Sequence, residues 1–275
     1  MIGKATLMCH ASHHTITRGL LLALTTARLA APLSAQISTA EYQARRDSLA
    51  ARIGEGVVIG FGGRTPITDF GPFFQLPAFR YLTGYLHADA AFVMVVRSGR
   101  GSTTLFVNRS TPRRTLYYGV EPDSAALLRD LGLGSRMAVE LAPVADSLAA
   151  AGLKVYGLRD FEAADFAGAD SLTRGGQFFR ALAAKHPGVT VENAHPIVDQ
   201  LRARKSEAEL ALIRRATDIG VEGHIELMRR AEPGMHEYDL QAIIESAFRR
   251  GGAERPAYGS IVGAGPNGTQ LHYMK

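Results

Sequence analysis

The sequence is poor in cysteine, in tryptophan and in long apolar runs. Its single cysteine, Cys9, excludes a disulfide within the chain and a zinc site built from several cysteines. No apolar run reaches the roughly 18 residues that a membrane-spanning helix needs. The net charge is +5, and residues 1–35 carry +3 of it, so the remainder carries only +2. This weak charge gives no reason to propose nucleic acid as a partner, because nucleic-acid binding requires a basic face or stripe.

Motifs of several hydrolase classes are missing as well. The sequence has no His-Glu-x-x-His zinc motif, no Gly-x-Ser-x-Gly nucleophile turn, and no cysteine after residue 9 that could act as a nucleophile. What is present is the composition of an ordinary folded protein, with 46% hydrophobic and 21% charged residues. A length of 275 residues indicates one or two domains.

Residues 1–36 have the pattern of a signal peptide. A short apolar core at residues 19–27 follows basic residues, and Leu33-Ser34-Ala35 before Gln36 is a plausible cleavage site. We therefore expect a secreted or periplasmic protein.

Residues 37–160 are predicted to form an α/β domain, because strand and helix patterns alternate along them. Residues 92–96 and 103–107 flank a glycine-containing turn and indicate a hairpin. The other predicted elements are helices at 39–49, capped by Ser38 or Thr39, and near 122–131 and 141–151, with strands at 56–63 and 154–158. Residues 161–205 form a connecting segment, with a helix at 178–185 and a strand at 189–191.

Residues 206–275 begin with the strongest local signals of the chain. Ser206-x-x-Glu209 is a capping box, in which each side chain satisfies a free backbone amide at a helix start. Apolar residues then recur at three- or four-residue intervals as far as Pro233-Gly234, which predicts one long helix. His224 falls on this stripe and is interpreted as a buried core histidine. A second amphipathic helix is predicted at 237–250.

The end of the chain reads as a short strand at 260–262, a glycine-rich turn, and an apolar piece presenting His272. Gly263, Gly265 and Gly268 match the G-x-G-x-x-G pattern of dinucleotide sites. That pattern requires a helix opening after the last glycine, and the short sequence that follows gives no such signal. A structural turn is favoured; nucleotide binding would require ATP or NAD to protect the chain against thermal unfolding. Taken alone, His272 is more typical of a hydrogen-bonded core residue.

The segment Ser260-Ile261-Val262-Gly263-x-Gly265-x-Asn267, followed by Leu271-His272-Tyr273, resembles the Xaa-Pro aminopeptidases of the creatinase/prolidase ("pita-bread") metallopeptidase family. The resemblance extends over about residues 38–275. Phe79-Arg80-Tyr81-Leu82-Thr83-Gly84-Tyr85 is similar to an aromatic-Tyr-Leu-Thr-Gly segment of that family, and Tyr118 stands where the family has tryptophan. The implied fold class is α/β (α+β): a creatinase-like N-terminal α/β domain followed by the first part of a pita-bread domain.

The resemblance also implies a chemistry. His272 would contact the substrate and the tetrahedral intermediate without binding metal. The family uses two divalent metal ions, typically Mn²⁺, held by two Asp, one His and two Glu. Those ligands follow the Leu-His-Tyr segment in the family, so none can be assigned in this chain. The implied partners are a peptide substrate with proline in the second position and further copies of the chain in a homo-oligomer.

We expect the chain to be the front of a longer gene product and to be inactive by itself. Its two last helices are expected to expose apolar faces. Two alternatives stay open: a prolidase- or creatinase-type hydrolase of the same fold, and a catalytically inactive interaction or oligomerisation protein. The DNA downstream distinguishes an enzyme from an inactive protein, because it either encodes an in-frame Asp-x₁₀-Asp or does not.

Overall fold

The computed structural model describes residues 37–66, 73–159 and 173–273. The predicted signal peptide at 1–36 lies outside these residues. In the described part of the chain, no helix is both long enough and apolar enough to cross a membrane.

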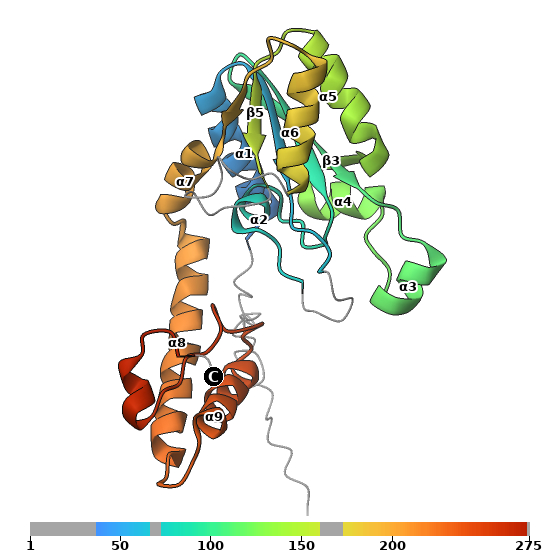
Figure 1. Cartoon of the computed structure of the whole chain (residues 1–275). Helices are drawn as coiled ribbons and strands as arrows, with labels where there is room; N and C mark the ends of the chain where they lie inside the picture. Colours follow the sequence, from blue (N-terminus) through green and yellow to red (C-terminus); the bar gives the residue numbers. More distant parts are fainter. Residues whose placement is uncertain (1–36, 67–72, 160–172, 274–275) are drawn as a thin grey trace, which may run out of the picture. The chain divides into compact units, whose positions relative to one another are not determined.

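A mixed sheet of six strands, in the order β4-β3-β2-β1-β5-β6, organises the first part of the described chain (Figure 1). The pairs β1–β2 and β2–β3 are antiparallel, and the other three neighbouring pairs are parallel. The strands are β1 (Gly56–Phe61), β2 (Ala91–Arg97), β3 (Arg100–Val107), β4 (Gly134–Met137), β5 (Val155–Leu158) and β6 (Val191–Asn193).

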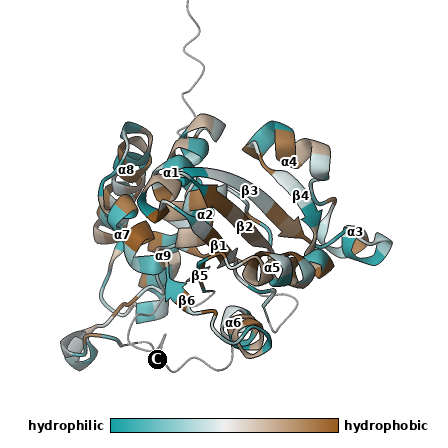
Figure 2. Ribbon diagram, turned by 90° about the horizontal axis from the view of Figure 1, so that it is seen from above, coloured by the Kyte–Doolittle hydropathy of each residue, from teal (hydrophilic) through white to brown (hydrophobic). Residues whose placement is uncertain are grey.

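Helices cover both faces of this sheet, so a central strand is buried throughout. In β1 all six residues are buried, with Val58 in one apolar cluster and its neighbours Val57 and Ile59 in the other. This alternation follows from the two-residue repeat of a strand. Figure 2 shows the apolar strands β1 and β2 between the helices of the two faces. One cluster includes residues of α1 (Thr39–Ile53), α2 (Pro77–Thr83), α4 (Ser124–Leu131) and α7 (His195–Ala203), and the other includes residues of α5 (Leu141–Ala150) and α6 (Arg174–Lys185).

Local signals in the sequence account for the elements that were predicted. Ser38 caps α1, because its side chain accepts a hydrogen bond from the amide of Glu41. The hairpin is confirmed, and its two-residue turn holds Ser98 and Gly99 at φ 48° and 72°, the left-handed values that such turns require. The strand predicted at 189–191 is displaced and lies at Val191–Asn193, because its pairing with β5 begins at Val191. The structure adds α2, α3 (Pro112–Tyr118), α7 and β4, which the sequence did not predict, and α6 begins at Arg174, before the predicted helix at 178–185.

The two long helices that follow the sheet domain are α8 (Glu207–Arg230) and α9 (Glu237–Arg250), which lie side by side (Figure 1). The capping box at the start of α8 is confirmed: Glu209 N donates to Ser206 Oγ at 3.1 Å, and Ser206 N donates to Glu209 Oε2 at 2.9 Å. The helices approach closely at Gly223, where an added Cβ would lie 2.6 Å from the ring of Phe248. A glycine at this position lets α9 pack against α8.

The prediction that His224 is a buried core residue is wrong, because the side chain is exposed. The buried residues of α8 are Ile219 and Gly223, so α9 covers a different face from the apolar stripe. Residues on that stripe remain exposed, among them Met228 at 70%. Periodicity located the stripe correctly, but it could not say which side the next helix would cover. His224 Nδ1 instead lies 2.8 Å from the carbonyl oxygen of Gly220, one turn earlier in α8.

The strand predicted at 260–262 is also wrong. These residues have no regular secondary structure, and a short 3₁₀ helix follows at Gly265–Thr269. A strand requires a neighbour to pair its backbone amides and carbonyls. No described strand pairs with these residues, and Ser260 instead bonds through its side chain to α9.

Candidate functional site

His272, the predicted catalytic residue, lies at the end of a loop that is attached to α9. Near the start of α9, Glu237 Oε1 accepts hydrogen bonds from Ala264 N at 3.1 Å and from Asn267 Nδ2 at 2.9 Å. Two turns later, Glu245 Oε1 accepts a hydrogen bond from Ser260 Oγ at 2.7 Å. The loop therefore runs antiparallel to α9 and is attached to it at two levels.

The turn between these attachments depends on glycine and asparagine. A Cβ added to Gly263 would lie 2.9 Å from the carbonyl oxygen of Asn267, so no larger residue fits without a backbone shift. Gly265 has φ 51°, in the left-handed region. Asn267 N donates to Ala264 O at 3.0 Å and closes the turn. In residues 265–273 no α-helix follows Gly268, so the glycines form a turn here and not the start of a phosphate-binding helix.

The hydrogen bonds to α9 also act on its carboxylates. The bond from the Asn267 side chain, with a smaller contribution from the Ala264 amide, lowers the pKa of Glu237. The bond from Ser260, followed by that from Gln241, lowers the pKa of Glu245. Both shifts favour the charged form, which is the stronger acceptor.

The ring of His272 is exposed, and it makes no hydrogen bond or ion pair with the described part of the chain. Its neighbour Leu271 is 91% exposed, whereas Tyr273 is half-buried. An exposed imidazole on a loop held in place by α9 is available to a ligand. The catalytic role of His272 stays a prediction.

The described residues do not fit a metal centre on their own. They contain no group of three or more His, Cys, Asp or Glu side chains that could hold a metal ion. A structural zinc site needs four such ligands and a catalytic one three, so the described residues alone do not form one.

The sequence did not predict the residues of α9 that accept hydrogen bonds from the loop. Glu237, Gln241 and Glu245 are spaced by four residues and form one ridge on α9, in which Gln241 Nε2 donates to Glu245 Oε1 at 2.9 Å. The sequence showed only that this face of the helix is polar, which is typical of a solvated surface. The four-residue spacing of polar acceptors was the available signal.

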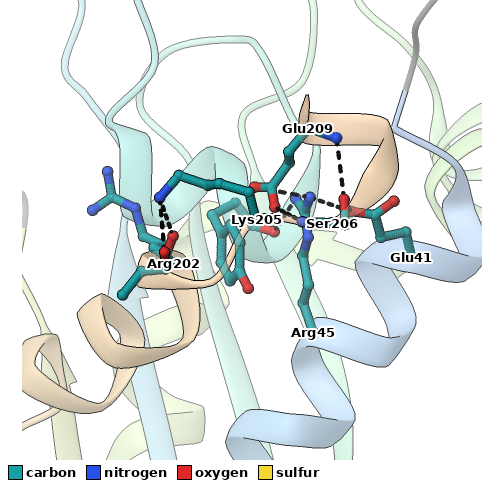
Figure 3. A network of polar contacts seen from close by, with 8 residues as sticks. Glu41, Arg45, Arg202, Lys205, Ser206 and Glu209 are labelled. Carbon is teal, nitrogen blue, oxygen red and sulfur yellow. Dashed lines mark hydrogen bonds and ion pairs between the residues drawn. The ribbon is translucent and has the colours of Figure 1, made fainter. Parts of the chain in front are cut away.

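A second polar cluster joins the first helix to the start of α8 (Figure 3). The guanidinium of Arg45 pairs with the carboxylates of Glu41 and Glu209, with 3.2 Å between Arg45 Nη2 and Glu209 Oε1. Arg45 also donates to the carbonyl oxygen of Tyr81 at 3.2 Å and lies 4.2 Å from the centre of its ring. Ser206 Oγ donates to Glu41 Oε1 at 2.7 Å. One cation thus links α1, the end of α2 and the capping box of α8.

This cluster borders an open groove of about 970 Å³, lined by Tyr42, Arg80, Leu131, Arg202 and Leu212 among others. The groove mixes both signs of charge with apolar side chains, so no single class of ligand is favoured. Lys205 Nζ faces α7, where it donates to the carbonyl oxygen of Arg202 at 2.6 Å.

Two family descriptions match separate parts of the chain. Residues 42–149 match "Aminopeptidase P, N-terminal domain", and residues 211–275 match "Metallopeptidase family M24". The first range holds most of the sheet, and the second holds nearly all of α8, all of α9 and the loop with His272. The chain therefore has a sheet domain followed by the beginning of a pita-bread domain, the arrangement of an aminopeptidase P-like metallopeptidase. This confirms the predicted fold class.

Relatives of known sequence that resemble this chain are described as Xaa-Pro aminopeptidases. The chain is 28% identical over 250 residues to the Xaa-Pro aminopeptidase of Escherichia coli K12, covering 87% of this chain and 56% of the relative. It is 30% identical over 204 residues to a probable Xaa-Pro aminopeptidase of Metarhizium acridum, covering 73% and 37%. The chain thus spans about half or less of the length of these relatives.

Solved structures agree with the sequence relatives. A histidine-to-alanine variant of E. coli aminopeptidase P has a TM-score of 0.74 at 27% identity, over 86% of this chain and 55% of that one. Proline aminopeptidase P II from Yersinia pestis has a TM-score of 0.72 at 28% identity, over 86% and 56%. The family descriptions, the sequence relatives and the solved structures thus agree on aminopeptidase P, and the predicted resemblance is confirmed. The domain boundaries at residues 160 and 205 stay predictions.

Proposed function

We propose that the protein is an Xaa-Pro aminopeptidase, which removes the N-terminal residue of peptides with proline in the second position. The observation that carries this proposal is the loop bearing His272, which lies in the part of the chain that matches the metallopeptidase family. The relatives named above are described as Xaa-Pro aminopeptidases, which supports this substrate class over that of a prolidase or a creatinase.

In this proposal, His272 donates a hydrogen bond to the substrate. Hydrolysis of a peptide bond develops negative charge on the carbonyl oxygen, and a donor held at that place stabilises the transition state. The imidazole of His272 is exposed, and the described chain offers it no competing acceptor. The two anchors on α9 keep the loop in place before substrate arrives.

A metallopeptidase activates the attacking water with divalent metal ions. We propose two ions, Mn²⁺ in the native protein, held by residues other than those described here. A solved structure of E. coli aminopeptidase P is described as zinc-substituted and in complex with product, which supports a divalent site in that relative.

The test is a peptidase assay on the complete translation product of the gene. A peptide with proline in the second position should be cleaved, and a matched peptide with alanine there should stay intact. A chelator should abolish cleavage. His272→Ala should lower kcat by at least about tenfold, as expected when a transition-state donor is lost. His224→Ala is the matched control, because it removes another exposed histidine and should leave kcat unchanged. Cleavage of both peptides, or of neither, would refute the substrate assignment.

Export and self-association complete the proposal. The pattern of residues 1–36 supports a secreted or periplasmic protein, and the N-terminus of the mature protein should then be Gln36. Family resemblance supports a homo-oligomer. N-terminal sequencing and light scattering of the purified protein test these two points separately. An intact Met1 in the exported fraction would refute the first, and a monomeric mass would refute the second.

A further inference from the structure

The helix α9 uses two faces for two purposes. Ile243 and Ile244 are buried, and the ring of Phe248 contacts α8 at Gly223. Glu237 and Glu245 lie on another face, eight residues apart, and therefore about 12 Å apart along the helix axis. This polar face is half-buried, because the loop that ends at His272 lies on it.

Polar contacts attach this loop to the helix. Residues 260–262 form no strand, so no backbone ladder connects them to another element. Apolar packing of this loop is partial: Leu271 is almost fully exposed, whereas Ile261 is 38% exposed and Val262 is half-buried. Residues 257–273 donate hydrogen bonds to α9 from three groups, Ser260 Oγ, Ala264 N and Asn267 Nδ2, and each acceptor is a glutamate oxygen.

Glu237 fixes both ends of the turn. The same oxygen, Oε1, accepts from Ala264 and from Asn267, which are themselves joined by the bond from Asn267 N to Ala264 O. An acidic residue in the first turn of a helix is common, since it interacts favourably with the helix dipole. The dipole alone does not require two loop donors to meet at one carboxylate oxygen.

We propose that Glu237 and Glu245 are positioning residues, which hold the loop at residues 260–273 on α9 and thereby fix where the ring of His272 stands. The inference rests on the proposed function only for the catalytic meaning of that position. The attachment of the loop can be measured in the 275-residue chain without any activity.

The first measurement is amide hydrogen exchange of Ala264 by NMR, together with the ring resonances of His272. Glu237→Ala removes the acceptor and should raise the exchange rate of the Ala264 amide by roughly tenfold or more, since hydrogen bonds to charged groups are the stronger ones. Glu237→Gln keeps a carbonyl oxygen at the same place and should restore most of the protection. Glu222→Ala, which removes an exposed carboxylate of α8, is the matched control.

Three results would overturn the proposal. An Ala264 exchange rate in Glu237→Ala equal to that in the Glu222→Ala control would mean that Glu237 does not hold the loop on α9. The glutamine variant could lose as much protection as the alanine variant, so that charge near the helix start matters and not the acceptor. Exchange could rise while the His272 resonances stay unchanged, so that the attachment does not position the ring. Glu245→Ala should repeat the effect on His272, through Ser260.

A second readout separates this inference from the proposed function. In the complete translation product, Glu237→Ala should lower kcat for the Xaa-Pro peptide with KM little changed, and Glu237→Gln should recover it. If Glu237→Ala raises the Ala264 exchange rate in the 275-residue chain but the complete protein cleaves no Xaa-Pro peptide, the proposed function is refuted and the attachment of the loop to α9 is supported. If the protein cleaves the peptide and Glu237→Ala leaves kcat unchanged, the positioning role fails.

Discussion

Replacing Arg45 tests whether one guanidinium holds the start of α8 to the first helix. The Arg45 side chain is 8% exposed, and its partners Glu41 and Glu209 are 20% and 19% exposed. Arg45→Met keeps the aliphatic stem but leaves two carboxylates without their cation. Removing one partner of a buried ion pair costs about 3–5 kcal/mol. Because both carboxylates keep some access to water, we expect a free energy of unfolding lowered by about 3 kcal/mol.

Urea unfolding followed by circular dichroism measures this loss. Arg52→Met is the matched control, because Arg52 lies on the same helix, is exposed, and donates a hydrogen bond to Gln200 Oε1 at 3.1 Å. Its cost should stay within about 0.5 kcal/mol, as for most surface substitutions. Arg45→Lys should be intermediate, since a compact ammonium group cannot reproduce the planar fork. A cost for Arg45→Met no larger than that of the control would refute the reasoning.

A double variant separates charge from packing in the same cluster. Adding Glu209→Gln to Arg45→Met removes one of the two unpaired carboxylates and should restore part of the lost stability. If stability does not recover, the cost of Arg45→Met comes from lost contact with the ring of Tyr81 and not from unpaired charge.

Three further predictions concern α8. Gly223→Ala should destabilise the chain by about 1–3 kcal/mol in thermal unfolding, since the new Cβ meets the Phe248 ring. Gly220→Ala places its Cβ where nothing lies within 4 Å, so it should be neutral or stabilising by up to about 1 kcal/mol. Equal effects of the two substitutions would refute the packing argument. Ser206→Ala removes the helix cap and should cost about 1 kcal/mol, measured by urea unfolding against Ser246→Ala within α9. Arg250 and then Arg230 lower the pKa of Glu226, so these ion pairs stabilise the fold above the ordinary Glu pKa and lose this effect as pH falls through the lowered pKa. The melting temperature of Glu226→Gln should therefore fall less between pH 7 and pH 3 than that of the parent, and an identical fall would contradict this assignment.

Local patterns predicted the elements whose signals lie in neighbouring residues. The capping box at Ser206 located the start of α8, and Pro233-Gly234 located its end, because both act on the backbone within one turn. The hairpin at Ser98 and Gly99 is similar, since its turn needs two residues with positive φ. The site was predicted in part: the glycine-rich turn was found, whereas Glu237 and Glu245 were predicted only as part of an amphipathic helix at 237–250.

By itself, the sequence determined where α8 and α9 start and stop, the presence of strand β1, and the family that the loop with His272 resembles. These follow from short-range rules and from motifs that lie within a few residues. The tertiary structure decided which face of α8 is covered, because that depends on how Phe248 meets Gly223 from another helix. It also decided that residues 260–262 form no strand, since a strand exists only where a partner edge is present. Their donors meet carboxylates of α9 instead, and no pattern within the loop could have shown that.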